Sequence, residues 1–132
     1  MLKKGVASTT RVVLYARVAT KAQATDDRCT LDAQLTELRD YAARQGWLNA
    51  GEFSETISGL RRDRPQLEAV LGLVQERAFD ILLVHELSRL SRSIAHILDI
   101  LDILENHQVG FASVKEPDFD FTEWGKTVPL II

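Results

Sequence analysis

The stretch VVLYARV, residues 12–18, decides the fold, and the rest of the chain can be interpreted around it. It is β-branched, aromatic and apolar on both faces, which is typical of a central strand in a sheet covered on both sides. ILLVHEL, residues 81–87, has the same buried character. VGFASV at 109–114 and the short GEFSE at 51–55 are further candidate strands.

Helical patterns fill the intervals between these strands. Thr30 is a suitable N-cap and Gly46 a suitable end for the first helix, Pro65 suits the first position of the second, and Ser93 can cap the third. The apolar stripes of the three helices are Leu31, Leu35, Leu38 and Ala42; Leu67, Val70, Leu71 and Val74; and Ile94, Ile97, Leu98, Leu101 and Leu104.

Strands that alternate with helices predict an α/β fold: a single domain with a central, mostly parallel sheet of about four to five strands and helices on both faces. The 132 residues suit one domain, with residues 1–10 as a loose lead-in and 11–132 as the domain. Ligands of such sheets bind beyond the carboxyl ends of the strands. Arg17 and Arg89 are both expected at such ends, so we expect them to face one crevice.

Composition narrows the function. The net charge of −3 argues against a chain that coats nucleic acid by bulk electrostatics. A phosphate site must therefore come from clustered arginines, which outnumber lysines eleven to five. The single cysteine, Cys29, excludes an internal disulfide and a multi-cysteine metal site. No membrane helix or secretory signal is visible, so a cytoplasmic location is expected.

The common cofactor motifs are missing from the sequence. Neither G-x-G-x-x-G nor G-x-x-x-x-G-K-[ST] occurs, so no nucleotide cofactor is expected. His85, His96 and His107 lack partners at metal-ligand spacing and are interpreted as packed or solvated. The acidic residues Asp99, Asp102 and Glu105 are interpreted as a solvated helix face, and no metal or other cofactor is expected.

Four arginines are left to explain: Arg17, Arg64, Arg89 and Arg92 fall at strand ends or in the loops that follow. Fixed cations in one crevice repel one another unless an anion binds between them, which favours a phosphate or carboxylate ligand. The alternative is that each arginine pairs with a nearby acid, for which Asp63, Glu55 and Glu86 are available.

Four segments together resemble the catalytic domain of the serine recombinases, the resolvase/invertase family that includes the large phage integrases. They are YARVAT at 15–20, TLDAQLTELRDYAARQGW at 30–47, ISGLRRDRPQLEAVL at 57–71 and ELSRLSRS at 86–93. The similarity runs from about residue 11 to the end of the chain, and its specificity comes from the order and spacing of all four.

The resemblance implies site-specific DNA strand exchange without metal or nucleotide. In the family, a serine hydroxyl attacks a backbone phosphate, forms a phosphoseryl link to the 5′ end and leaves a free 3′ hydroxyl. Double-stranded DNA is the implied substrate, and the implied assemblies of the full-length parent are a homodimer and a synaptic homotetramer. A prokaryotic, phage or mobile-element context follows.

The site residues are carried over position by position. Arg17 matches the arginine two positions before the nucleophile, Gln34 the glutamine that helps hold the phosphate and the loop beneath it, and Arg64 the arginine before the Pro65 helix. Arg89 and Arg92 match the pair that grips the scissile phosphate. Further DNA contacts are expected from Arg61 and Arg62, and support from Tyr15, Ser88 and Glu55.

Two positions depart from the family pattern. The nucleophilic serine falls at position 19, where this chain has Ala19, and an aspartate is usual where this chain has Ser88. Alanine offers no oxygen to phosphorus, and Thr20 next to it would point the opposite way in extended backbone. The chain as written is therefore expected not to cleave DNA. A deliberate serine-to-alanine change and natural decay of the enzyme both explain Ala19.

The last residues, PDFDFTEWGKTVPLII, resemble the approach to a long helix that supports dimerisation and lies on DNA. We therefore expect a truncated catalytic domain without its DNA-reading region. Three hypotheses remain: a recombinase catalytic domain without its nucleophile, a non-catalytic DNA-associated assembly module, and an unrelated parallel-sheet protein whose arginines bind a small anion or a partner.

Overall fold

The computed structural model describes residues 9–18, 30–57 and 64–117, in which helices and strands alternate as the sequence predicts. The elements are β1 (Arg11–Val18), α2 (Leu31–Gln45), β2 (Leu48–Thr56), α3 (Pro65–Gln75), β3 (Ile81–Val84), α4 (Leu87–Leu90), α5 (Ile94–Asn106) and β4 (Gly110–Ser113).

The four described strands form one sheet in the order β2-β1-β3-β4, and all three neighbouring pairs are parallel. The first strand is therefore central, as its apolar character on both faces predicts. Since the strands are parallel, their carboxyl ends meet at one edge of the sheet, where Arg17 of β1 lies opposite Glu55 of β2.

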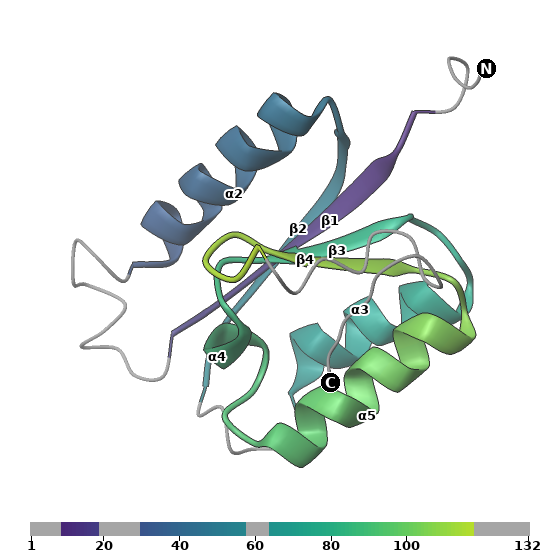
Figure 1. Cartoon of the computed structure of the whole chain (residues 1–132). Helices are drawn as coiled ribbons and strands as arrows, with labels where there is room; N and C mark the ends of the chain where they lie inside the picture. Colours follow the sequence, from purple (N-terminus) through teal and green to yellow (C-terminus); the bar gives the residue numbers. More distant parts are fainter. Residues whose placement is uncertain (1–8, 19–29, 58–63, 118–132) are drawn as a thin grey trace.

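The helices cover both faces of this sheet, with α2 on one side and α3 and α5 on the other (Figure 1). Alternate residues of β1 point to opposite faces. Val12 and Leu14 belong to the core under α2, while Val13 and Tyr15 belong to the core under α3 and α5. The predicted α/β architecture is confirmed.

The predicted helix boundaries are also confirmed. The Thr30 hydroxyl accepts a hydrogen bond from the Ala33 amide at 2.9 Å, and Gly46 ends α2 in the left-handed region at φ 77°. Pro65 is the first residue of α3, and the Ser93 hydroxyl accepts from the His96 amide at 3.2 Å. Thr30, Ser93 and Gly46 pair backbone groups that a helix end leaves without partners, and Pro65 has no backbone N–H that would need one.

Two strand boundaries differ from the prediction. The strand expected over 51–55 runs from Leu48 to Thr56, and the one expected over 81–87 ends at Val84. Arg89 therefore does not lie at a strand end but in the short helix α4, and the prediction that a strand end positions it is wrong. The cause is local: the chain stays extended at Glu86 (φ −156°, ψ 160°) and then turns into a helix.

The buried face of α5 is rotated from the predicted stripe. Ile94 and Leu98 are 76% and 60% exposed, whereas His96, Ile100 and Leu104 are buried. The helix is apolar at so many positions that its sequence permits more than one face. A histidine can lie on the buried face because its Nδ1 is 3.1 Å from the Ser91 hydroxyl, which satisfies the ring.

Several predicted features lie outside the described residues. They are Ala19, Thr20, Cys29, Arg61, Arg62, Asp63, most of the lead-in and residues 118–132. Among the helices that are described, none has both the length and the apolar character needed to cross a membrane.

Candidate functional site

Arg17 occupies the carboxyl end of β1 with its guanidinium buried, at 1% exposure. Its Nε donates to the carbonyl of Arg89 at 2.9 Å, Nη2 to that of Ser88 at 2.6 Å and Nη1 to that of Ile57 at 2.8 Å. One side chain thus ties the central strand to α4 and to the end of β2.

The pKa of Arg17 shows that the predicted arginines share one electrostatic environment. Burial, together with the positive charges of Arg64, Arg89 and Arg92 and against an opposing effect of Tyr15, lowers this pKa to about 10. Like charges disfavour the protonated form only when they are close. Arg17 is therefore near enough to each of the other three guanidiniums to be repelled by them.

Gln34, at the start of α2, completes the ladder of the central strand. Its Oε1 accepts from the Arg17 amide at 3.2 Å, and its Nε2 donates to the Arg17 carbonyl at 3.0 Å. The neighbouring strand β3 pairs with β1 only as far as Tyr15, so the amide side chain takes the place of a missing strand residue. This satisfies two backbone groups that would otherwise be buried without partners.

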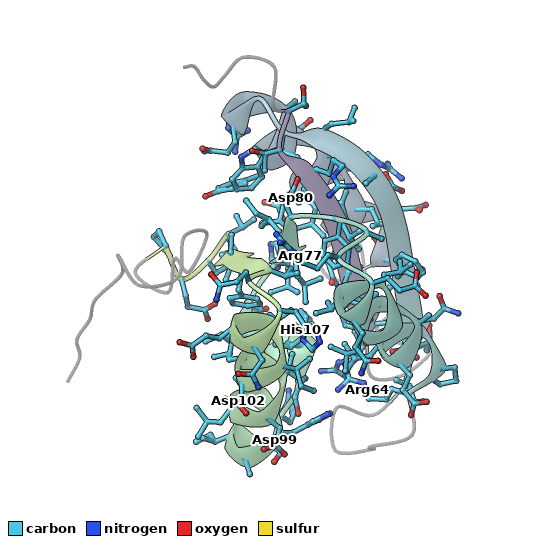
Figure 2. The ribbon with its side chains drawn as sticks, turned by 90° about the vertical axis from the view of Figure 1, so that its right-hand side faces the viewer. Arg64, Arg77, Asp80, Asp99, Asp102 and His107 are labelled. Carbon is cyan, nitrogen blue, oxygen red and sulfur yellow. The ribbon has the colours of Figure 1, made fainter. Side chains whose placement is uncertain are left out.

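Arg64, the residue before α3, is completely buried. Its Nη2 donates to the Tyr15 hydroxyl at 2.6 Å and to the Arg89 carbonyl at 3.4 Å. Within the described residues, Nε and Nη1 have no hydrogen-bond partner, although Nε lies 3.8 Å from Glu55 Oε2. Burying guanidinium donors without acceptors costs free energy, and a bound anion would remove that cost by accepting their hydrogen bonds. Figure 2 shows Arg64 well away from Asp80, which directly precedes β3.

Glu55 is the carboxylate at the centre of this region. It accepts from the Tyr15 hydroxyl at 2.5 Å and from the amides of Gln66 and Leu67 at 3.1 and 3.0 Å. Those two amides are unpaired donors of the first turn of α3, where negative charge is favoured. Burial, followed by the hydrogen bond to Glu55, raises the pKa of Tyr15. Tyr15 is thus a neutral link between Glu55 and Arg64.

Arg89 and Arg92 extend the cluster toward solvent. The Arg89 side chain is 13% exposed, and its Nε lies 3.4 Å from Glu86 Oε2, at ion-pair distance but without hydrogen-bond geometry. Arg92 is exposed, and Ser88 is half-buried. Within the cluster, Arg17 and Arg64 are buried, Arg89 is partly buried and Arg92 is exposed to solvent.

The charges of this cluster do not balance within the described residues. Two carboxylates lie at ion-pair distance from the four guanidiniums, Glu55 near Arg64 and Glu86 near Arg89, so Arg17 and Arg92 have no ion-pair partner among the described residues. Pairing with acids therefore explains only part of the cluster. The excess favours the interpretation as an anion site, and the individual roles predicted for these residues stay predictions.

The other candidate groups have structural partners. His85 Nε2 lies 2.7 Å from Glu37 Oε1, and His107 Nδ1 lies 2.9 Å from the carbonyl of Ile103. Asp99, Asp102 and Glu105 are exposed on α5. No group of three or more potential metal ligands occurs among the residues that the structure describes.

One residue of this region was not predicted. Glu116, just beyond β4, accepts a hydrogen bond from the Leu87 amide at the start of α4. Its position directly after a predicted strand, at the edge of the sheet where ligands gather, is the signal that could have identified it.

Comparison with known proteins identifies the family. The family model of the resolvase N-terminal domain matches residues 12–129. The Transposon Tn917 resolvase of Enterococcus faecalis is 31% identical over 112 residues, which cover 85% of this chain and 53% of the relative. The Probable DNA-invertase y4cG of Sinorhizobium fredii is 36% identical over 108 residues, 81% of this chain and 30% of the relative. The chain thus spans about half or less of the length of these relatives.

Solved structures agree with this result. The N-terminal catalytic domain of TP901-1 integrase has a TM-score of 0.76 and 31% identity, over 82% of this chain and 80% of that one. The C-terminal catalytic domain of ISC1926 TnpA, an IS607-like serine recombinase, has a TM-score of 0.72 and 29% identity, over 79% and 67%. The hypothesis of an unrelated parallel-sheet protein is wrong. With its parallel sheet and arginine-rich edge, the chain belongs to the resolvase N-terminal domain family of serine recombinases.

Proposed function

We propose that this chain is the catalytic domain of a site-specific DNA recombinase and that its arginine cluster holds one DNA phosphodiester beside position 19. The observation that carries the proposal is the excess of positive charge around Arg17, Arg64, Arg89 and Arg92. A phosphodiester supplies the missing negative charge, and arginine is suited to it because its donors match phosphate oxygens.

The reaction proposed for the parent protein is a phosphoryl transfer in which the energy of the broken DNA bond is kept in the covalent protein–DNA link. A serine oxygen at position 19 forms a bond to phosphorus while the bond from phosphorus to the 3′ oxygen breaks, and the serine proton is released as the 3′ hydroxyl gains one. Negative charge grows on the phosphoryl oxygens in the transition state, and fixed guanidiniums stabilise it without a metal ion. The reverse attack by a 3′ hydroxyl reseals the strand.

With Ala19 in place of serine, the first step has no nucleophile. Loss of the nucleophile from a comparable covalent site lowers the rate by roughly a millionfold. The arginines proposed to hold the phosphate match the family pattern, so this chain is proposed to engage DNA without cutting it. Double-stranded DNA as the substrate, a homodimer that pairs into a synaptic homotetramer, and a cytoplasmic location in a prokaryote remain proposals for the full-length parent.

The test is the change Ala19→Ser in the full-length parent, incubated with DNA that carries its recombination site. We expect a covalent protein–DNA adduct that withstands denaturing electrophoresis, and none from the parent with Ala19. A matched control, Ala19→Thr, tests whether any hydroxyl at this position is sufficient. Synapsis of the Ala19→Ser parent without an adduct would contradict the proposal.

A second candidate function is a non-catalytic module that assembles with active relatives on DNA. The observation that favours it is the pair of departures, Ala19 and Ser88, because both remove groups that the family uses. The sequence of the natural locus separates the two candidates: a serine codon at position 19 excludes the non-catalytic module.

A further inference from the structure

The short helix α4 cannot owe its conformation to its own hydrogen bonds. It has four residues, and its N-cap, Glu86, makes no side-chain capping bond. Isolated helices much longer than this are marginal in water because the first turn fixes many dihedral angles for few hydrogen bonds. Contacts from other elements must therefore hold α4, which carries Arg89, in place.

Two sets of contacts do so, one at each end. At the carboxyl end, Arg17 donates to the carbonyls of Ser88 and Arg89, and Arg64 donates to the latter. At the amino end, Glu116 Oε1 accepts from the Leu87 amide at 3.0 Å. The charges of these side chains complement the helix ends: cations lie at the end with free carbonyls, and an anion lies at the end with free amides.

Glu116 is itself firmly held. Its Oε1 accepts a second hydrogen bond, at 2.5 Å, from the hydroxyl of Ser113, the buried last residue of β4. The Val114 and Lys115 amides donate to the carbonyls of Val84 and His85 at 3.0 and 2.9 Å, so the backbone that follows β4 stays bonded to the backbone that follows β3 as far as Lys115, next to Glu116. The carboxylate is thus fixed by the sheet and can fix α4 in turn.

We propose that Glu116 is a positioning residue for strand cleavage, which acts by fixing the amino end of α4 and so the orientation of Arg89. The inference rests on the proposed function, because Arg89 is there a phosphate ligand. Glu116 binds the helix at the end away from the Arg17 contacts, and a carboxylate beside a phosphodiester would repel it. Its effect therefore passes through α4, and any substrate contact of its own is unnecessary.

The first test uses this chain and needs no activity. Amide hydrogen exchange should become at least about tenfold faster at Arg89 and Ser91 in Glu116→Ala, because these amides donate within the α4 turn. Glu116→Gln keeps an acceptor oxygen and should restore slow exchange. Glu105→Ala, an exposed acid on α5, is the matched control and should change neither amide. Unchanged exchange in Glu116→Ala overturns the inference.

The second test uses the Ala19→Ser parent. Glu116→Ala should lower the single-turnover rate of adduct formation at saturating DNA by at least about tenfold, a loss that fits one hydrogen bond to a charged group. Affinity for the DNA site should change by less than about threefold, and Glu116→Gln should recover most of the rate. A purely structural role would not give this recovery with unchanged affinity. Faster exchange with an unchanged rate overturns the positioning role.

The two failures can be told apart. If no Ala19→Ser variant forms an adduct although synapsis occurs, the proposed function fails, and the positioning role fails with it. If the Ala19→Ser parent is active and Glu116→Ala is equally active, the proposed function stands and the inference alone is overturned.

Discussion

The two ends of β1 each carry an arginine, and the two arginines have different kinds of partners. At the amino end, Arg11 meets an acid of its own: its Nε and Nη2 donate to the carboxylate of Asp80 at 3.2 and 3.3 Å, and its amide donates at 2.8 Å. At the carboxyl end, Arg17 is buried and its side chain donates to three backbone carbonyls, with further arginines nearby.

The difference separates a complete ion pair from a cluster that we propose to bind an anion. Arg11 and Asp80 neutralise each other at a partly exposed site, with side chains 43% and 32% exposed, and this arrangement needs no ligand. The carboxyl end keeps more cations than anions in a buried setting, which costs stability unless an anion is bound. A folded domain retains such a cost where its function requires it.

The largest effect should come from Glu55, the carboxylate nearest to the buried Arg64. Glu55→Gln removes the negative charge near Arg64 and leaves a buried cation uncompensated, so we expect the free energy of unfolding in urea to fall by about 3 kcal/mol. Glu52→Gln on the same strand is the matched control. It breaks the exposed pair with Arg39, which solvent screens, so its loss should be much smaller. Equal losses in the two variants would remove the distinction between the two ends.

A medium effect should come from inorganic phosphate. If the arginine cluster binds it, a concentration of ten times Kd stabilises the fold by about 1.4 kcal/mol, seen as a rise in Tm over chloride at the same ionic strength. Arg11→Gln, at the opposite end of the strand, should keep this rise. Arg89→Gln should reduce it, and an undiminished rise in Arg89→Gln would count against the cluster as the site.

The smallest effect should come from the amino end, and it should depend on pH. Partial burial alone would raise the pKa of Asp80, but the hydrogen bonds from Arg11 outweigh it, so the pKa is lowered. A lowered carboxyl pKa stabilises the fold above the unfolded-state pKa and loses that effect as the pH falls through the folded-state value.

Asp80→Asn should therefore lower the free energy of unfolding by no more than about 1 kcal/mol at neutral pH. The difference from the unchanged chain should shrink between about pH 5 and pH 2. Urea unfolding at several pH values checks this. A difference that grows on acidification would contradict the assigned shift.

The sequence predicts those parts of the fold that depend on neighbouring residues. Thr30 and Gly46 bound α2 because capping is decided within a few positions. The rotation of α5 could not be predicted, since Ile94 and Ile100 are equally apolar and only packing against the sheet selects between their faces.

In the candidate site, too, some features can be predicted from nearby residues and others depend on contacts between distant segments. The resemblance supplies the positions of the arginines, but the link from Glu55 through Tyr15 to Arg64 joins Tyr15 to residues 40 and 49 positions away, which no local pattern specifies. The same is true of Glu116, whose contact with Leu87 spans 29 positions. Contacts between distant segments decide how the guanidiniums are held, and these require the folded structure.

Glu55 of β2 accepts hydrogen bonds from the first turn of α3, so the length of its side chain sets the spacing between β2 and α3. The carboxyl group bonds directly to the Gln66 and Leu67 amides, so the distance from sheet to helix is set by two methylene groups. A shorter aspartate in place of Glu55 would have to bring α3 closer by about 1.5 Å or leave those two amides without an acceptor. Recombinase domains spliced together from different relatives will therefore fit best when β2 and α3 are exchanged as one piece.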